Sequence, residues 1–438
     1  MKIIPIFLIF LISLSQCNII RKTRRSKHGE DCLSNSSCEE GLVCKINRCY
    51  TPYEADNLSK LGLEEKNVCN LVKKCKGNLV CYKHRCIDSL LAAEYSKPKP
   101  PVNPEEEEDI SMVFSGSIFL NKMPYLSGLK TDNTFDYTHL FTHVTNFIKH
   151  ADISVAFEET PFYINQNQNK KIKPDFKNTP KELGNAIANA GFKTVVHASS
   201  SAYDKSDAGI INTLSFWNNE HPDVKVLGIS KSTVSENNYH IFEKNGVKIA
   251  IINFATQLTK SLPKDKNYMV NMLTKEKIEL IMASIKNQAD FFVACVNWGV
   301  KGDKKPSNKQ IHFAKMLIAA GVNLIIGNNP DYVQPVSYVK AANGNCGLVF
   351  FSLGLFIGDG KNNLGSLAHL IITKDKTRTY ISSYSLRPTI NHKVNTKTYS
   401  VYRLHEYTQE LGHQSTKKVD VVKLRKVCKK IMGAFAYC

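Results

Sequence analysis

Between about residue 110 and residue 386, short apolar runs alternate along the chain with longer amphipathic stretches. This alternation is typical of an α/β sandwich, because buried strands read as brief apolar runs and surface helices as periodic ones. The apolar runs predict strands at Ser111–Phe114, Ile153–Ala156, Thr194–His197, Lys225–Leu227, Lys248–Phe254, Phe291–Val296, Leu324–Ile326, Leu348–Ser352 and Ala368–Thr373. The amphipathic stretches predict helices at Asp136–His150, Pro180–Ala190, Asp207–Glu220, Lys275–Gln288 and Lys309–Ala320. Gly191 and Gly321 directly follow two of these helices, where a left-handed residue commonly ends a helix.

The first 17 residues follow the pattern of an export signal. Lys2 precedes an apolar run from Ile3 to Leu14 that is too short to cross a bilayer easily, and small or polar residues lead from there to Cys17. We expect a signal peptide over residues 1–17, cleaved near Cys17, with a lipoprotein site at Cys17 or an uncleaved anchor as alternatives. No later run reaches about 18 apolar residues, so we expect no further transmembrane span and a secreted or cell-surface protein.

Eight cysteines between residues 28 and 90 form a repeat. Two groups with the same internal spacing lie 37 residues apart: Cys32, Cys38, Cys44 and Cys49, then Cys69, Cys75, Cys81 and Cys86. Units as small as 32–49 and 69–86 cannot bury a sufficient core, so we expect two disulfides within each, with the pairing left open. Zinc is the alternative, although the segment has no C-x2-C pair. The repeat resembles cysteine-rich modules of the dickkopf N-terminal type, and Asn35 and Asn57 begin glycosylation sequons.

Two further segments frame the α/β region. Residues 95–109 are rich in proline and glutamate and predict an extended linker, so a domain boundary falls there. Residues 387–438 form a basic extension, in which lysines flank a helical apolar periodicity that predicts a basic amphipathic helix. The apolar face of this helix either packs on the sandwich or leaves the helix able to bind an anionic membrane or glycan.

The whole chain has 438 residues and a formal net charge of +19, mostly from scattered lysines. Its 42% hydrophobic and 22% charged residues are an ordinary globular balance, which excludes wholesale disorder and a polytopic membrane protein. The positive charge fits either a soluble lysine-rich surface or attraction to an acidic partner. Because the export signal argues against nucleic acid, we expect a cell-surface polymer, glycan or protein as the partner.

Polar loops follow several of the predicted strands, and in open α/β sheets such strand ends gather at one site. Their motifs resemble, in order, those of the bacterial capsule-synthesis CapA (poly-γ-glutamate) family, which is related to metallophosphoesterases. The matching segments are Glu159-Thr160-Pro161 with NLETP, 198–214 with ANNHxxDxGxxGxxxTL, 245–250 with NGVKIA, Asn297-Trp298-Gly299 with HWGxEYxxxPxxxQ, 321–335 with aGaDxViGhHPHvxQP, and 351–356 with YSLGNF. The resemblance covers about 245 residues and implies a metallophosphoesterase-like α/β sandwich over residues 110–386.

This chain departs from those motifs where the resemblance implies metal ligands. In place of a Gly-Asp loop, an Asn-Asn-His triplet and several histidines, it has Ser117, then Ser199, Ser200 and Ser201, then Asn297, and then Asn328, Asn329 and Asp331. Glu159 keeps an expected ligand identity, and Asp204 lies nearby in sequence. We therefore expect no bound transition metal and no required cofactor, with Glu159 and Asp331 as weak metal candidates. Such oxygen donors would suit a divalent cation such as Ca²⁺ or Mg²⁺ better than zinc.

The remaining cleft is expected to be rich in oxygen and amide groups, with no catalytic residue assigned. Its candidate members are Ser117, Glu159, Ser199, Ser200, Ser201, Asp204, Asn297, Trp298, Asn328, Asn329 and Asp331. These groups would either bind sugar hydroxyls, with Trp298 as a stacking face, or satisfy the backbone of their own loops. The sequence favours a secreted protein with a degenerate metal site that binds a surface polymer, glycan or protein partner. The alternative is an active metal-dependent hydrolase, or an enzyme that makes or processes a capsule-type polymer such as poly-γ-glutamate.

Overall fold

The computed structural model describes residues 43–45, 48–50, 79–82, 85–88, 108–162, 175, 177–233, 239–360, 363–395 and 397–432. The chain divides into two compact units, of which residues 20–107 form the smaller. Its described part is two hairpins, β1 (Val43–Lys45) with β2 (Arg48–Tyr50) and β3 (Leu79–Tyr82) with β4 (Arg85–Asp88). Cys44 lies opposite Cys49 in the first hairpin, and Cys81 lies opposite Cys86 in the second. The two sequence repeats therefore form equivalent hairpins at equivalent positions.

Several sequence predictions fall outside the described residues. They concern the signal peptide at 1–17, nearly all of the linker at 95–109, the sequons at Asn35 and Asn57, and the cysteine side chains of the repeats. These expectations stay predictions. Within the described ranges, no helix is long and apolar enough to cross a membrane.

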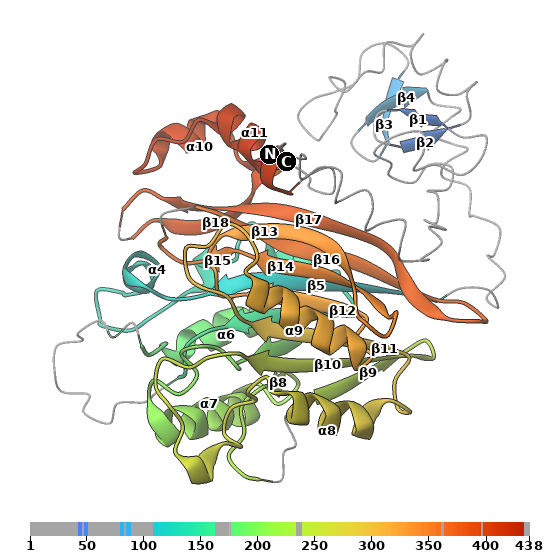
Figure 1. Cartoon of the computed structure of the whole chain (residues 1–438). Coiled ribbons are helices and arrows are strands. Elements are labelled where there is room, and N and C mark those ends of the chain that lie inside the picture. Colours follow the sequence, from blue (N-terminus) through green and yellow to red (C-terminus); the bar gives the residue numbers. More distant parts are fainter. Residues whose placement is uncertain are drawn as a thin grey trace, which may run out of the picture. The chain divides into compact units, whose positions relative to one another are not determined.

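The larger unit contains residues 108–438 and is built on two β-sheets (Figure 1). The first sheet has the strand order β18-β17-β16-β5-β6-β7-β8, and β15 also pairs with β5. The strands from β5 to β8 run parallel to one another, while β16 to β18 join them in antiparallel pairs. The bounds are β5 Glu108–Ile118, β6 Ile153–Glu158, β7 Thr194–Val196, β8 Lys225–Leu227, β15 Leu355–Ile357, β16 Leu364–Lys374, β17 Thr379–Lys393 and β18 Tyr399–Arg403.

The second sheet has the strand order β13-β14-β12-β11-β10-β9. Its four inner strands are parallel, and an antiparallel strand closes each edge. The bounds are β9 Tyr239–Lys244, β10 Val247–Ala255, β11 Phe291–Asn297, β12 Leu324–Asn328, β13 Val333–Lys340 and β14 Cys346–Leu353. Parallel strands buried on both faces are nearly continuously apolar, which explains why these runs stood out in the sequence.

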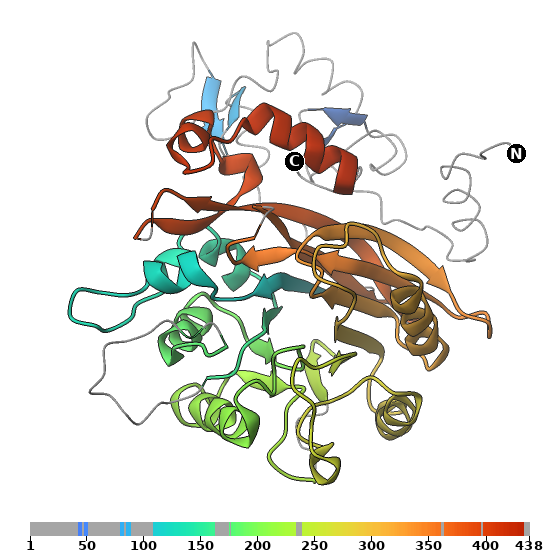
Figure 2. The ribbon, with the colours of Figure 1, turned by 60° about the vertical axis from the view of Figure 1, so that its left-hand side comes forward.

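The two sheets pack face to face, and helices cover both outer faces (Figure 2). Alternate residues of each strand point to opposite faces, so Met112 and Phe114 enter the core between the sheets while Val113 faces the helices. One outer layer contains α4 Lys122–Ser127, α5 Thr145–Lys149, α6 Lys181–Asn189 and α7 Ser206–Glu220. The other contains α8 Lys275–Ile285 and α9 Asn308–Ala319. The α/β sandwich predicted from the sequence is confirmed.

Each predicted strand coincides with an observed one, and four of the five predicted helices form within a few residues of their expected bounds. Gly191 and Gly321 have φ values of +99° and +109° directly after α6 and α9, as expected for residues that end helices. At the start of α9, Ser307 and Gln310 form a capping box. These local signals are strong because each one satisfies backbone groups that a helix end leaves unpaired.

The predicted helix at Asp136–His150 is wrong in part. The segment forms a 3₁₀ turn at Thr138–Leu140 and then the short α5, with an irregular stretch between them. The side chain of Asp136 accepts a hydrogen bond from the N–H of Thr138 and so starts a separate turn. The apolar positions that suggested a helix are nevertheless buried against the first sheet. The periodicity therefore indicated burial correctly but not the regularity of the backbone.

The C-terminal region continues the sandwich. The boundary placed at residue 386 falls inside β17, so the first sheet extends through β18. Pro388 in β17 and the many polar residues around it concealed this strand, because proline rarely lies within one. After α10 (Gln409–Gln414), the basic amphipathic helix forms as α11 (Val421–Met432). Its buried residues Val421, Cys428 and Met432 join the core between the sheets, so the apolar face packs on the sandwich.

Candidate functional site

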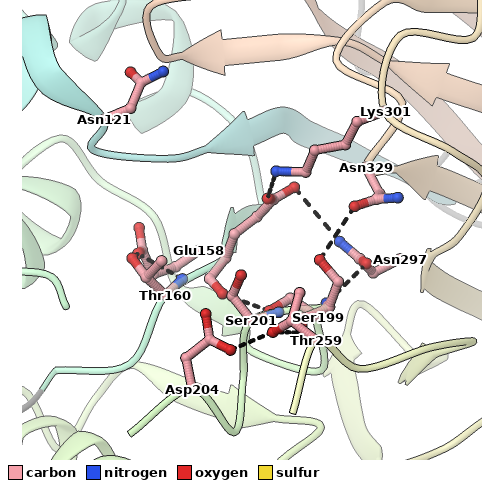
Figure 3. A network of polar contacts seen from close by, with 12 residues as sticks. Asn121, Glu158, Thr160, Ser199, Ser201, Asp204, Thr259, Asn297, Lys301 and Asn329 are labelled. Carbon is pink, nitrogen blue, oxygen red and sulfur yellow. Dashed lines mark hydrogen bonds and ion pairs between the residues drawn. The ribbon is translucent and has the colours of Figure 1, made fainter. Parts of the chain in front are cut away.

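The polar loops of the sequence motifs meet at one edge of the sandwich (Figure 3). In the first sheet, β6 leads to Glu159 and β7 leads to Ser199, Ser200 and Ser201. In the second sheet, β11 ends at Asn297 and β12 ends at Asn328. These four strands are parallel members of their sheets, so their carboxyl ends deliver the loops to one place.

Ser200 joins the serine loop of the first sheet to the asparagines of the second. Its backbone N–H donates to Oδ1 of Asn297 at 3.0 Å, and its hydroxyl donates to Oδ1 of Asn329 at 3.3 Å. The N–H of Ala198 similarly donates to Oδ1 of Asn253 in β10 at 2.7 Å. These amide oxygens are therefore engaged by the facing loop, which ties the two sheets together at the site.

The other serines and Asp204 are engaged in the same way. The hydroxyl of Ser199 donates to the backbone oxygen of Glu159 and accepts the N–H of Ser201 at 3.3 Å. The hydroxyl of Thr259 donates to Oδ1 of Asp204, and its N–H donates to the backbone oxygen of Ser200 at 2.8 Å. Thr259 lies in the loop after β10, so a third loop contacts the site. No sequence motif had indicated this residue.

A lysine that the sequence analysis missed lies at the centre of the charged groups. Nζ of Lys301 donates to Oε2 of Glu159 at 3.3 Å, and Nδ2 of Asn297 approaches Oε1 of the same carboxylate at 3.5 Å. The Lys301 side chain is 41% exposed, whereas that of Glu159 is 1% exposed. The ammonium nitrogen also lies 4.5 Å from the ring centroid of Phe119. The ring face and the carboxylate both favour the positive charge.

The charges around Lys301 interact over a wider range. Glu159 raises the pKa of Lys301 most strongly, and Asp331 and Asp204 raise it further. The partial burial of the lysine acts in the opposite direction and lowers its pKa. Burial raises the pKa of Asp331 to about 6, because Lys301 only partly offsets the desolvation and Glu159 repels the charged form. The backbone of Asp331 is left-handed, with φ of 64°, and that of Asn329 has φ of 99°. Aspartate and asparagine tolerate this region better than most residues do.

Most of the candidate residues are buried and do not line an open cleft. Glu159, Asn297 and Asn329 are at most 2% exposed, and Ser200 is 5% exposed. The strand ends therefore form a closed polar cluster that the exposed part of Lys301 covers. Three buried oxygens at this end have no hydrogen-bond partner among the described residues: Ser117 Oγ, Asn328 Oδ1 and Asp331 Oδ1.

Trp298 does not serve as a stacking face, which corrects the expectation from the sequence. Its ring is fully buried, at 0% exposure, and stacks on Phe351. Its indole N–H donates to the backbone oxygen of Phe351 at 2.8 Å. Trp298 instead fixes the loop, because Nδ2 of Asn329 donates to its backbone oxygen at 3.2 Å. His197 is also structural: it accepts the indole N–H of Trp217 at 2.9 Å, and burial lowers its pKa to about 3.

The donor set does not fit a dinuclear transition-metal site. Such a site needs several imidazoles and carboxylates close together. Within the described ranges, no three His, Cys, Asp or Glu side chains are grouped so that they could hold a metal ion. The amide oxygens of Asn297 and Asn329 already accept hydrogen bonds, and the carboxylate of Glu159 is paired with Lys301. We therefore derive no chemical step through a metal at this site.

Comparison with known proteins identifies the family of the larger unit. The profile of the family described as bacterial capsule synthesis protein PGA_cap matches residues 111–360, which is more than half of the chain. The chain belongs to this family. In the motif HWGxEY that this segment resembles, the fifth position falls on Lys301, where the motif has glutamate. Attention to that position would have found the lysine, because a change from acid to base inverts the local charge.

Two curated proteins are similar over the same region. The capsule biosynthesis protein CapA of Bacillus anthracis is 26% identical over 267 residues, which cover 59% of this chain and 62% of that protein. The PGA biosynthesis protein CapA of Bacillus subtilis (strain 168) is 25% identical over 262 residues, which cover 59% of this chain and 66% of that protein. The chain thus spans less than two thirds of the length of either relative.

Solved structures share a more distant likeness. A 5'-nucleotidase precursor from Thermus thermophilus has a TM-score of 0.41 and 13% identity, covering 65% of this chain and 54% of that one. The calcineurin-like phosphoesterase YfkN from Bacillus subtilis has a TM-score of 0.36 and 12% identity, covering 74% of this chain and 98% of that one. At these scores the likeness carries no conclusion about activity.

Proposed function

We propose that this PGA_cap protein is non-catalytic and acts outside the cell by binding a surface polymer, glycan or protein partner. The observation that carries the proposal is the ion pair between Lys301 and Glu159. Glu159 stands where the family motif keeps an acidic residue, and in this chain an ammonium group neutralises that carboxylate. A divalent cation would have to displace Lys301 before it could bind there.

The hydrogen bonds around this pair support the same proposal. Serine and asparagine stand in place of the expected ligands, and Ser200 bonds to Asn297 and Asn329 across the two sheets. A catalytic metal site needs open coordination positions for water and substrate. Here the corresponding space is closed by loops and by the lysine chain, so binding to a large partner would use the outer surface.

One observation favours the alternative of a metal-dependent hydrolase. Three buried oxygens, Ser117 Oγ, Asn328 Oδ1 and Asp331 Oδ1, lack hydrogen-bond partners within the described residues. Buried acceptors are usually satisfied by protein groups, ordered water or an ion. Oxygen donors of this kind suit Ca²⁺ or Mg²⁺. An ordered water would satisfy them equally well, and Lys301 opposes a divalent cation nearby through charge repulsion.

Metal content and hydrolysis together test the proposal. The purified chain is dialysed against Mn²⁺, Zn²⁺, Mg²⁺ and Ca²⁺ in turn, its bound metal is measured by mass spectrometry, and it is assayed with p-nitrophenyl phosphate and bis-p-nitrophenyl phosphate. We expect less than stoichiometric metal and no hydrolysis above the buffer. Stoichiometric metal together with hydrolysis that Glu159→Ala abolishes would establish the alternative.

A further inference from the structure

The last helix, α11, and the residues just before it carry far more basic than acidic side chains. Residues 417–430 hold one acidic residue, Asp420, and seven basic ones: Lys417, Lys418, Lys423, Arg425, Lys426, Lys429 and Lys430. Asp420 is engaged locally, because its carboxylate accepts the backbone N–H of Lys423. Within the described part of the chain, the lysines of α11 form no ion pair with an acidic side chain. No acidic side chain of the described residues neutralises them.

The helix is held firmly against the sandwich, so its outward face is fixed. Val421, Cys428 and Met432 are buried in the core between the sheets, and Cys428 also forms a disulfide. Arg425 lies toward the same side, and its guanidinium donates to the backbone oxygen of His405 at 3.2 Å. A partner would not need to order this helix, and a pre-ordered surface lowers the entropic cost of binding.

The outward side presents a line of three lysines, Lys423, Lys426 and Lys430, which we call the lysine stripe. With 3.6 residues per turn, these positions lie opposite the buried Val421 and Cys428. A rise of about 1.5 Å per residue separates successive lysines of the stripe by about 4.5 and 6 Å along the axis. The stripe therefore matches a linear chain with anionic groups at intervals of a few ångströms.

The apolar residues of the exposed surface lie beside the stripe. Val427 and Ile431, 40% and 36% exposed, flank it on one side, and Val422, 61% exposed, flanks it on the other. A helix that inserts into a membrane interface presents its apolar face outward and its lysines at the flanks, which is the reverse of this arrangement. Charged groups along the centre with small aliphatic patches beside them suit a chain of sugar rings that carry acidic groups and C–H surfaces.

We propose that the lysine stripe of α11 binds a linear acidic polysaccharide. This inference rests on the proposed function in that the chain acts by binding, but it uses a surface remote in sequence from the Lys301 cluster. Metal and hydrolysis measurements do not involve α11, so the two proposals fail separately.

Binding to immobilised heparin and alginate, a sulfated and a carboxylated polysaccharide, tests the stripe in the full secreted chain. The test variant is Lys423→Gln/Lys426→Gln/Lys430→Gln. The matched control removes the same charge from exposed lysines elsewhere, Lys286→Gln/Lys315→Gln/Lys376→Gln. We expect the test variant to bind roughly 100-fold more weakly at low salt, since a lysine near an anionic surface contributes about fivefold. The affinity of the control variant should stay within about twofold of the parent's. Raised salt should weaken polysaccharide binding most in the parent protein.

Three results would overturn the inference. Equal loss in the test and control variants would mean that net charge alone attracts the polysaccharide. Unchanged binding in the test variant would exclude the stripe. Binding to phosphatidylserine vesicles or to poly-L-glutamate that is tighter than binding to both polysaccharides, and lost in the test variant, would assign the stripe to a membrane or to a polypeptide. Circular dichroism before and after the substitutions checks that α11 still forms.

Discussion

The ammonium nitrogen of Lys301 lies 3.3 Å from Oε2 of Glu159, and of these two side chains only the lysine reaches solvent. The carboxylate is thus buried at the end of β6 and depends on a partner supplied by the loop after β11. Removing one partner of a buried pair leaves an uncompensated charge, which costs more than the pair itself contributes. This ion pair therefore adds a charged contact to the hydrogen bonds that join the two sheets at the site.

Replacing Lys301 should both destabilise the fold and open the site to cations. We expect Lys301→Ala to lower the free energy of unfolding by about 2 kcal/mol, because Glu159 is left buried without a counter-charge. In Lys301→Glu, which restores the acid of the family motif, Mg²⁺, Ca²⁺ or Mn²⁺ should raise the melting temperature, since a cation would relieve the repulsion between the two carboxylates. Urea unfolding measures the loss of stability in Lys301→Ala, and differential scanning fluorimetry with and without each ion measures the response of Lys301→Glu.

Lys305→Ala is the matched control for this prediction, because Lys305 is an exposed lysine of the same loop. It should change neither the melting temperature nor the response to cations. The same response in the parent protein and in Lys301→Glu would contradict the view that Lys301 keeps cations out.

Asp331 should make the stability depend on pH. Its folded pKa of about 6 is raised mainly by burial and lies above the value near 3.9 expected in the unfolded chain. The folded state therefore keeps a proton that the unfolded state releases, so this group's contribution falls as pH rises from about 4 to 6. Asp331→Asn removes the titration and suits the left-handed backbone at this position. Urea unfolding should show that the free energy of unfolding of the variant rises relative to that of the parent over this window. Above about pH 7 the difference between the two proteins should stay constant.

Much of the fold could be predicted from the sequence, because buried parallel strands leave short apolar runs that little else imitates. Several strands were not predicted, among them β17, which contains Pro388. The helix predicted at Asp136–His150 has the apolar spacing of a helix, but its backbone is helical only in part. In both places the tertiary structure overrides a local signal. The distribution of apolar residues therefore indicated the layers of the sandwich better than the bounds of its elements.

The sequence also predicted that the polar loop residues of the candidate site would lie together, because the carboxyl ends of parallel strands converge. What the sequence could not show is which partner each polar group meets. Trp298 follows a strand and looked available, yet its indole N–H is bonded to Phe351 deep in the core. Lys301 and Thr259 form their hydrogen bonds with residues more than 50 positions away in the sequence. The pattern of a single sequence does not indicate which distant residues are in contact.

Gly228 should be required for the junction between the sheets near the site. Its φ is +91°, and a Cβ there would collide with Oδ1 of Asn253 and with the backbone N of Ala198. Those two atoms share the 2.7 Å hydrogen bond that ties the end of β7 to β10. Gly228→Ala should therefore lower the free energy of unfolding by about 3 kcal/mol, from backbone strain together with a lost buried hydrogen bond. Gly246→Ala, also at positive φ but with open space around it, should cost about 1 kcal/mol.

If the chain is exported as we propose, its N-terminal repeats should be oxidised. We expect all eight cysteines from Cys32 to Cys86 to form disulfides, because the two hairpins are too small to be stable without cross-links. Alkylation with and without prior reduction, followed by peptide mass spectrometry, counts the free thiols in this segment. Free thiols or bound zinc there would contradict the prediction.

N-terminal sequencing of the same sample should give a start near residue 18, and a start at Met1 would argue against signal cleavage.

Glu158, the neighbour of the site glutamate, should also control stability through pH. Its Oε1 accepts hydrogen bonds from Thr160 N, Thr160 Oγ1 and Thr179 Oγ1, while its buried Oε2 has no partner among the described residues. Burial raises its pKa to about 8, and the hydrogen bonds only partly oppose the shift. Because the unfolded chain releases this proton near pH 4.3, the contribution of Glu158 to stability falls as pH rises through the window up to about 8.

Glu158→Gln keeps the accepting oxygen and removes the titration, so its free energy of unfolding should match that of the parent near pH 5. Above that pH it should exceed the parent's by up to about 1.4 kcal/mol for each unit, because one pKa unit corresponds to that energy. Glu243→Gln, at a side chain that is 59% exposed, should follow the parent at every pH. Urea titrations of the three proteins between pH 5 and 9 compare them directly. If Glu158→Gln is instead less stable than the parent across the range, the carboxylate is ionised in the fold and its neighbours stabilise that charge.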